Sequence, residues 1–331
     1  MLKEAKLSSS KTVDLFLPSF VLREIDRHVD GSQVNEKEKD IGQSISSHSN
    51  KCQVCKATKL NEINDLVQKV RWHDQVVKSG KFNFQGCKFI VNNKINVKFM
   101  EQMLVDYSDK QVCKFLQFGF PISFQGDMSV FDSMDKWKYK NHKGAEDYPD
   151  QMNEYFGKEI KSKSIIGPFK DNPFCTPIVV SPLNSIPKKD VTERRVILDL
   201  SFPKGRSLND FVKKYEYLNE EVQLIFPKVD DFVKLVSVKG KGALMFKKDL
   251  RKAYRQIPID PGDYHLVTYY WRKHLFCDTV LSMGLRNAAY ICQRVTTAVA
   301  FIMFQLGVAI LNYLDDMAGV ESKVKADFAY R

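Results

Sequence analysis

The sequence predicts an α+β fold in which an antiparallel sheet is backed by helices. Short apolar runs bounded by turn residues indicate strands, whereas one longer run with apolar residues three and four positions apart indicates a helix. Two of the strands are separated only by the polar stretch Arg272-Lys273-His274, which is typical of a hairpin. With 331 residues, 44% of them hydrophobic, the chain is long enough to bury a substantial core.

The N-terminal part of the chain is expected to divide into two regions. Residues 1–51 include a long stretch rich in Ser, Lys and Glu and poor in aromatic residues, so we predict a flexible segment. Residues 52–145 are predicted to be a mostly helical accessory region, since residues 61–70 and 97–106 both show helical spacing. The remaining region, residues 146–331, carries the motifs on which a function can be argued.

Helices and strands are both expected in that remaining region. Prolines after the first helix punctuate extended chain, and Gly307 is suited to end the second helix because glycine accepts left-handed backbone. The helices are predicted at residues 147–159 and 287–306. The strands are predicted at residues 178–181, 195–200, 244–249, 265–271, 275–280 and 308–312.

The adjacent pair Asp315-Asp316 is the most informative feature of the sequence. Apolar residues 308–312 lead into the pair and residues 317–320 lead out, so two carboxylates fall at the tip of a hairpin. Neighbouring anions raise each other's pKa unless a cation lies between them. Mg²⁺ binds through one or two carboxylates and completes its shell with substrate phosphates, which makes nucleotidyl transfer the first chemistry to consider.

A third carboxylate, Asp249, ends the predicted strand at residues 244–249. It can meet Asp315 only if the two strands are neighbours in one sheet. Such an arrangement is what a two-metal site needs, because carboxylates from separate rigid elements must hold two ions about 3.5–4 Å apart. Taken alone, an Asp-Asp pair is also common turn chemistry, so the hypothesis depends on this adjacency.

Five segments between Ile186 and Val320 carry a family resemblance in their order and spacing. They are Ile186-Pro187-Lys188-Lys189, residues 194–201, residues 248–254, residues 282–288 and Tyr313-Leu314-Asp315-Asp316. Together they resemble a reverse transcriptase, an RNA-directed DNA polymerase. The linking segments at residues 199–205 and 254–258 are most similar to the polyproteins of tyrosine-recombinase retrotransposons. The resemblance implies a right-hand polymerase with fingers and an antiparallel palm sheet.

The resemblance also implies roles at the metal site and beneath the incoming sugar. Asp249, Asp315 and Asp316 would be the catalytic carboxylates and ligands of two Mg²⁺ ions, for which Mn²⁺ could substitute. The Leu250 carbonyl would be a further metal ligand. Tyr254 aligns with the aromatic gate that excludes a 2′-hydroxyl; its alternative reading is a core aromatic residue.

Further nucleotide-binding residues are implied by the same resemblance. Arg195 and one of Lys188 or Lys189 align with fingers residues that hold the triphosphate; alternatively, Arg195 pairs with Asp199 or Glu193. Met283 and Gly284 fall at the floor of the nucleotide site, with Gly284 in a tight turn that would let template or nucleotide approach the backbone. The sequence departs from the family pattern here, with Ser282, Met283 and Ala289 where other residues are usual.

The chain ends soon after the Tyr313–Asp316 motif, so the resemblance implies a polymerase truncated before its thumb. The rest of the palm, the thumb and any ribonuclease H segment are expected to belong to the remainder of a polyprotein. The partners that follow are an RNA or DNA template with its primer, and deoxynucleoside triphosphates.

Composition agrees with a polyanionic partner. The chain has 51 Lys and Arg residues against 40 Asp and Glu, a formal net charge of +11. Each basic cluster taken singly could be an ordinary solvated face. No run reaches the roughly 18 apolar residues of a membrane span, and Pro18 interrupts the N-terminal apolar stretch that a signal peptide would need. We expect no membrane partner and an intracellular protein, with cytoplasm and nucleus both open.

The seven cysteines, an odd number, favour reduced thiols over a disulfide framework. His48, Cys52 and Cys55 form half of a zinc site, which His73 or Cys87 could complete, although no second paired motif supports it. The remaining cysteines lie in apolar contexts and are predicted to be small core residues: Cys113, Cys175, Cys277 and Cys292.

The leading hypothesis is therefore an RNA-directed DNA polymerase fragment of a retroelement that catalyses Mg²⁺-dependent nucleotidyl transfer to a primer 3′-hydroxyl. Two alternatives stay open. The chain could be a catalytically inactive, truncated module that only binds nucleic acid, or a Mg²⁺-dependent nuclease or other phosphotransferase that uses the same carboxylates.

Overall fold

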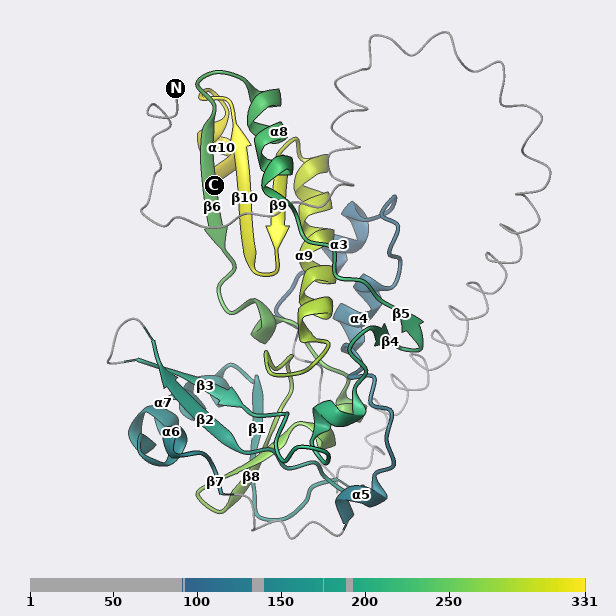
Figure 1. The fold of residues 1–331 in the computed structure, drawn as a ribbon, viewed down its shortest axis with the longest axis vertical. Coiled ribbons are helices and arrows are strands. Elements are labelled where there is room, and N and C mark those ends of the chain that lie inside the picture. Colours follow the sequence, from purple (N-terminus) through teal and green to yellow (C-terminus); the bar gives the residue numbers. More distant parts are fainter. Residues whose placement is uncertain (1–90, 92, 133–139, 175, 189–192, 331) are drawn as a thin grey trace, which may run out of the picture.

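The computed structural model describes residues 91, 93–132, 140–174, 176–188 and 193–330 (Figure 1). These residues form a mixed fold of helices and antiparallel sheets, which confirms the α+β prediction. The predicted flexible segment, the zinc ligands His48, Cys52 and Cys55, and Lys189 lie outside the described residues.

One three-stranded antiparallel sheet, here called the palm sheet, holds the predicted carboxylates. Its strands, in the order β6-β10-β9, are β6 (Leu244–Asp249), β10 (Asp316–Glu321) and β9 (Ile310–Tyr313). The sheet is packed against helices α8 (Val229–Lys239), α9 (Ala288–Gln305) and α10 (Ala326–Tyr330) (Figure 1).

Both faces of the palm sheet are apolar because helices cover both. Leu311 packs in a cluster around Leu235 of α8, whereas its neighbour Ile310 packs in a second cluster with Ala300 of α9 and Ala329 of α10. Successive strand residues point to opposite faces, so neighbouring apolar residues such as Ile310 and Leu311 of β9 pack on opposite sides of the sheet. The palm sheet is therefore a rigid support for whatever stands at its end.

A second sheet and the β2–β3 ribbon lie below α9 in Figure 1, and the β4–β5 ribbon lies beside the lower end of α9. The second sheet has the order β1-β8-β7 and consists of β1 (Ile165–Phe169), β8 (His274–Asp278) and β7 (Thr268–Trp271). The ribbons are β2 (Leu183–Pro187) with β3 (Arg194–Leu198), and β4 (Glu216–Tyr217) with β5 (Glu220–Glu221). Arg272 and Lys273 both have positive φ, which makes the predicted β7–β8 turn a type I′ turn.

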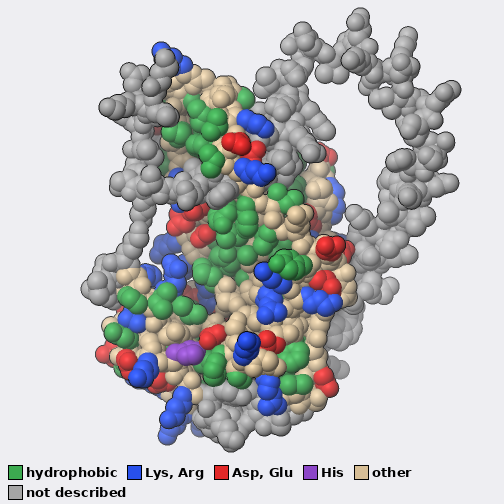
Figure 2. All heavy atoms as spheres, viewed as in Figure 1, with side chains coloured by type: hydrophobic (Ala, Val, Ile, Leu, Met, Phe, Trp, Pro, Cys, Tyr) green, Lys and Arg blue, Asp and Glu red, His purple; other side chains and the backbone are tan. Residues whose placement is uncertain are grey.

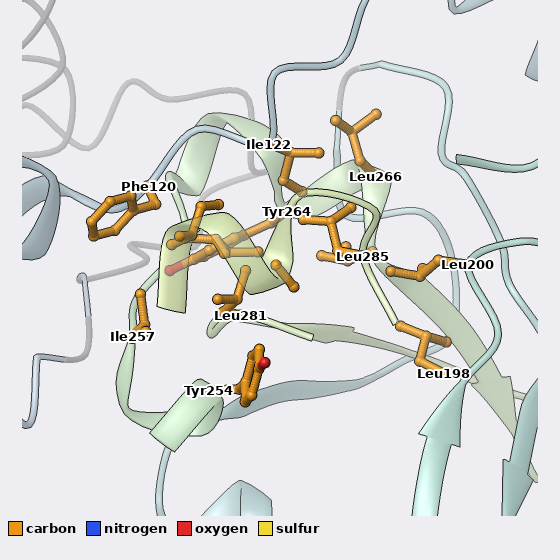
Figure 3. Packing of buried hydrophobic residues seen from close by; sticks show 14 of the residues in the cluster. Phe120, Ile122, Leu198, Leu200, Tyr254, Ile257, Tyr264, Leu266, Leu281 and Leu285 are labelled. Carbon is orange, nitrogen blue, oxygen red and sulfur yellow. The ribbon is translucent and has the colours of Figure 1, made fainter. Parts of the chain in front are cut away.

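The remaining elements complete one large core. They are α3 (Val97–Met103), α4 (Val112–Phe118), α5 (Ser129–Asp132), α6 (Lys143–Glu146), α7 (Pro149–Lys161) and the 3₁₀ helices η1 (Leu208–Phe211), η2 (Ala253–Gln256) and η3 (Pro261–Leu266). Buried residues from Met100 to Ile302 belong to this cluster, part of which is shown in Figure 3. Cys113, Cys277 and Cys292 are buried and free, as predicted, and Cys175 is not described.

Two strand predictions were wrong in detail. Residues 178–181 form no strand: Val180 makes an isolated bridge to Thr268, because Pro177 and Pro182 restrict pairing on either side. The strand predicted from residue 265 begins only at Thr268, since the preceding residues are wound into η3. That helix starts with Pro261 after the cap residue Asp260, whose side chain accepts the Gly262 N–H.

The described part of the accessory region packs directly on α9. Tyr107 contacts the Phe301 ring at 5.0 Å, and Arg294 forms two hydrogen bonds with the Asp109 carboxylate. No helix among the described residues has both the length and the apolar character to cross a membrane.

Candidate active site

The structure brings Asp249, Asp315 and Asp316 to the same end of the palm sheet. Asp249 and Asp316 are direct partners across β6 and β10, and such partners have Cα atoms about 4.5–5.5 Å apart. Asp315 lies in the two-residue turn between β9 and β10, and its carbonyl accepts the Leu250 N–H at 2.8 Å. The predicted adjacency of the two strands is therefore observed.

The turn itself is held by a side chain that the sequence did not single out. Leu314 has φ +53, which is uncommon for leucine, and its N–H donates to Gln293 Oε1 of α9 at 2.8 Å. Gln293 Nε2 donates in turn to the Asn312 carbonyl at 3.1 Å, and Asn312 Nδ2 donates to Thr296 Oγ1 at 3.0 Å. These contacts fix the turn that carries Asp315 onto the longest helix of the described chain.

A signal for this clamp exists in the sequence. Gln293, Thr296 and Thr297 are polar residues three and four positions apart within an otherwise apolar helix, so they share one helical face. A buried polar group needs a partner, and the face with these residues packs on β9. The partner could have been sought in the Asp315-Asp316 turn.

Like charges dominate the electrostatics at this end of the sheet. Burial raises the pKa of Asp249, and the Asp315 and Asp316 carboxylates raise it further. One cation counters them: Lys247 of β6 lies 2.9 Å from Asp316. The carboxylates of Asp249, Asp315 and Asp316 would therefore be stabilised by a further positive charge between them.

The three carboxylates suit a hard divalent cation by their chemistry, although they are not arranged as a finished cage. Within the described ranges, no three His, Cys, Asp or Glu side chains are already grouped closely enough to hold a metal. Lys247 forms an ion pair with Asp316, and Asp249 lies near the negative charges of Asp315 and Asp316. Carboxylate oxygens are the donors that Mg²⁺ prefers. The residues present therefore fit a cation that would replace the Lys247 ammonium.

Tyr254 lies on η2, a few residues after Asp249, at the edge of the packed cluster in Figure 3. Its ring is buried, and its hydroxyl is hydrogen-bonded to the Cys292 thiol. Burial raises its pKa, and Cys292 and Asp315 act in the same direction. Tyr254 is thus a neutral ring close to Asp315, so it is both a core residue and a residue of the site.

Lys188 and Arg195, two of the predicted triphosphate-binding residues, lie just after β2 and on β3; this ribbon is away from the palm sheet (Figure 1). Lys188 is exposed and pairs with Glu193 at 2.7 Å. Arg195 is exposed on β3 opposite Ile186. Of the two carboxylates considered as alternative partners of Arg195, Asp199 binds His142 at 3.0 Å and Glu193 binds Lys188 at 2.7 Å.

Met283 and Gly284 lie in the turn before α9. Met283 is 57% exposed. A Cβ on Gly284 would lie 2.6 Å from the Leu198 carbonyl oxygen, and the Gly284 carbonyl accepts Asn209 Nδ2 at 2.8 Å. The glycine is therefore required by the close approach of the end of β3, a reason different from the approach of template or nucleotide that the sequence suggested.

The face of the molecule drawn in Figure 2 carries both hydrophobic and charged side chains. Figure 2 shows hydrophobic side chains gathered across its middle, with Lys and Arg side chains on both sides of them. Exposed apolar residues of the described chain include Ile225, which precedes α8, and Val229 and Val233 on α8.

Comparison with known proteins agrees with this geometry. Residues 186–326, somewhat less than half of the chain, match the family described as reverse transcriptase (RNA-dependent DNA polymerase). The matched segment contains all of the predicted site residues outside the zinc motif. No curated protein matches the chain in sequence.

Two solved structures are similar to the chain at low identity. One is a protease–reverse transcriptase of prototype foamy virus, a CSH mutant, with a TM-score of 0.41 and 13% identity over 78% of this chain and 30% of that chain. The other is a foamy viral protease–reverse transcriptase in complex with double-stranded DNA, with a TM-score of 0.40 and 15% identity over 73% of this chain and 41% of that chain. The chain thus spans less than half of the length of either protein.

Proposed function

We propose that the chain is the fingers and palm part of an RNA-directed DNA polymerase that extends a primer by Mg²⁺-dependent nucleotidyl transfer. The observation that carries the proposal is the pairing of Asp249 with Asp316 across two strands, with Asp315 in the adjoining turn, inside the segment that matches the reverse transcriptase family. The resemblance of the linking segments further supports a retrotransposon origin of the tyrosine-recombinase type.

The carboxylates and the Leu250 carbonyl would hold two Mg²⁺ ions, or Mn²⁺ in their place. Bound there, the ions supply a lowered pKa for the primer 3′-hydroxyl and charge neutralisation for the departing pyrophosphate. Lys247 pairs with Asp316 at 2.9 Å in the metal-free site and would move off it when the site is loaded. Gln293 holds the turn so that Asp315 keeps its position throughout the cycle.

The other site residues would bind and select the nucleotide. The neutral ring of Tyr254 would pack beneath the incoming sugar and leave no room for a 2′-hydroxyl, which favours deoxynucleoside triphosphates. Arg195, with Lys188 or Lys189, would close on the triphosphate by a movement of the β2–β3 ribbon toward the palm sheet, since Arg forks and Lys charges suit phosphate oxygens. Met283 would line the site beside Gly284, and its exposed side chain is free to do so.

The template would be RNA or DNA paired with a primer, and the net positive charge supports binding of either. A thumb and a ribonuclease H segment would be supplied by the remainder of a polyprotein. The alternative of a module that only binds nucleic acid is favoured by one observation, the ion pair that leaves the carboxylates short of a finished metal cage.

Primer extension on an RNA template tests the proposal. The chain, alone and joined to the thumb segment of its own polyprotein, is expected to add deoxynucleotides in Mg²⁺, and Asp315→Asn is expected to lose at least about a thousandfold in rate because charge stabilisation is lost. Asp230→Asn, an exposed change on α8, is the matched control and should retain full activity.

Undiminished extension by Asp315→Asn would contradict the proposal. Nucleic-acid binding without extension by the thumb-containing protein would favour the binding module. Cleavage of nucleic acid without nucleotide addition would favour a nuclease.

A further inference from the structure

A second cluster of charged groups, here called the Glu159 network, lies outside the carboxylate site. Glu159, in the last turn of α7, is only 1% exposed. Its carboxylate accepts Lys252 Nζ at 2.6 Å and Arg255 Nε at 3.0 Å. Arg255 also donates to Asp278 at 2.6 Å, and Asp278 accepts the Tyr269 hydroxyl at 3.1 Å.

The network holds both sides of Tyr254. Lys252 precedes the tyrosine by two residues and Arg255 follows it directly, so two bonds to a single carboxylate span the residue. The partners come from different elements, since Glu159 is on α7 and Asp278 is at the end of β8. The short segment between β6 and η2 is thereby fastened to the second sheet and its helix.

The backbone at Lys252 also indicates a held conformation. Its φ of 54 and ψ of 43 lie in the left-handed region, which side chains with a Cβ seldom adopt. The residue is the N-cap of η2, but its side chain makes no capping bond; the ammonium instead reaches Glu159. A strained residue persists where surrounding contacts determine it. The ion pair to Glu159 is such a contact.

The charges of the network are balanced, because the carboxylates of Glu159 and Asp278 meet the cations Lys252 and Arg255. Burial acts to raise the pKa of Glu159, but Arg255 and Lys252 outweigh it and hold that pKa below its usual range. Burial opposes the charge on Arg255, yet Asp278 and the other anionic partners keep its pKa well above the usual range. An arrangement of this kind is rigid, because the loss of one member leaves a buried charge without its partner.

We propose that Glu159 and Arg255 are positioning residues that fix Tyr254 under the incoming sugar and thereby set the preference for deoxyribonucleotides over ribonucleotides. This inference depends on the proposed polymerase function. Neither residue contacts the reacting atoms; both act through the backbone on the two sides of Tyr254. A gate excludes a single hydroxyl only if its ring is held to within a fraction of an ångström.

The test uses the full chain and three variants. Glu159→Gln keeps the size of the side chain and removes its charge. Lys252→Gln is the milder change, because the Lys252 side chain is 54% exposed and Glu159 keeps Arg255 as a partner. Lys158→Gln is the matched control, since this neighbouring lysine pairs with Glu154 on the surface of the same helix.

Two measurements are made on each variant. Hydrogen–deuterium exchange follows the peptide amides of residues 250–258 and, for comparison, those of residues 310–318. Single-nucleotide incorporation gives the ratio of kcat/KM for dATP to that for ATP, with the thumb segment joined where the chain alone is inactive. For Glu159→Gln and Lys252→Gln we expect faster exchange in residues 250–258 only, and a ratio that falls by about tenfold through misplacement of the gate. Lys158→Gln should change neither.

Each other outcome overturns the proposal in a recognisable way. Unchanged exchange in residues 250–258 would show that the network does not hold the Tyr254 segment. Faster exchange in both peptides would show a merely structural role, as would equal losses with dATP and ATP at a constant ratio. If the unaltered protein incorporates no nucleotide, the polymerase function fails and this proposal with it; a polymerising protein whose variants keep the ratio defeats this proposal alone.

Discussion

The two charged clusters of this molecule are built in opposite ways. In the Glu159 network, buried carboxylates are matched by Arg255 and Lys252, and the hydrogen bonds are made within the protein. At the end of the palm sheet, Asp249 lies near the like charges of Asp315 and Asp316, and Lys247 is the cation paired with Asp316. A satisfied cluster holds the fold together, whereas an unsatisfied one is prepared for a ligand of positive charge.

The largest effect on stability should come from breaking the satisfied cluster. Arg255→Met removes the shared partner of Glu159 and Asp278 and leaves both carboxylates buried, so we expect a loss of about 3–5 kcal/mol in the free energy of unfolding. Urea denaturation measures it. Lys158→Met, at an exposed ion pair, should leave the free energy of unfolding almost unchanged. Equal losses in the two variants would remove the contrast between a buried network and a surface pair.

A smaller loss of stability, with a large loss of activity, is expected from Gln293→Ala. The change leaves the Leu314 N–H and the Asn312 carbonyl without their side-chain partner, at a cost of about 1–3 kcal/mol. Because the turn also carries Asp315, nucleotide addition should fall by about a hundredfold. Gln305→Ala, at the exposed end of α9, is the control for both measurements. A stable variant with full activity would show that the clamp is dispensable.

A mutation in the carboxylate cluster of Asp249, Asp315 and Asp316 should raise the free energy of unfolding instead of lowering it. The pKa of Asp249 is raised in the folded state, so its ionised form disfavours folding once the pH exceeds that pKa, and the penalty is absent below the pKa of the unfolded state. Metal-free Asp249→Asn should therefore be slightly more stable than the unaltered chain at pH 7, by less than about 1 kcal/mol because the site is exposed to solvent, and no more stable at pH 3. Thermal unfolding in EDTA at both pH values decides this. Destabilisation at pH 7 would contradict the description of the cluster.

The smallest effect expected is on metal affinity. Lys247→Met removes the ammonium that competes for Asp316, so Mg²⁺ should bind a few-fold more tightly, which is a change of about 1 kcal/mol. Calorimetric titration with Mg²⁺ measures it, and Lys241→Met, an exposed lysine outside the strand, is the control. Weaker binding by Lys247→Met would indicate that the lysine supports the metal site instead of competing for it.

The sequence was sufficient for the parts of this site that depend on local patterns. An apolar hairpin with Asp315-Asp316 at its turn, and a strand ending at Asp249, can be read from residue type and spacing, and the structure pairs them. It was insufficient for contacts between distant elements. Nothing near Glu159 in the sequence indicates Arg255 or Asp278, because their meeting depends on how α7 packs against the second sheet.

Other differences have local physical causes. Residues 178–181 have strand composition, but the flanking prolines leave only a bridge at Val180. Gly284 was correctly identified as a tight position, yet the atom that approaches it belongs to Leu198, more than eighty residues earlier in the chain. The sequence pattern can indicate that a position must be a glycine, but only the fold shows which atoms approach it.

The most direct test of the proposed metal site is a crystal structure of the chain with Mn²⁺, recorded at a wavelength where manganese scatters anomalously. We predict an anomalous peak in contact with the carboxylates of Asp249, Asp315 and Asp316, with the Lys247 ammonium displaced from Asp316. Mn²⁺ bound elsewhere, with Lys247 still paired to Asp316 at saturating metal, would contradict it.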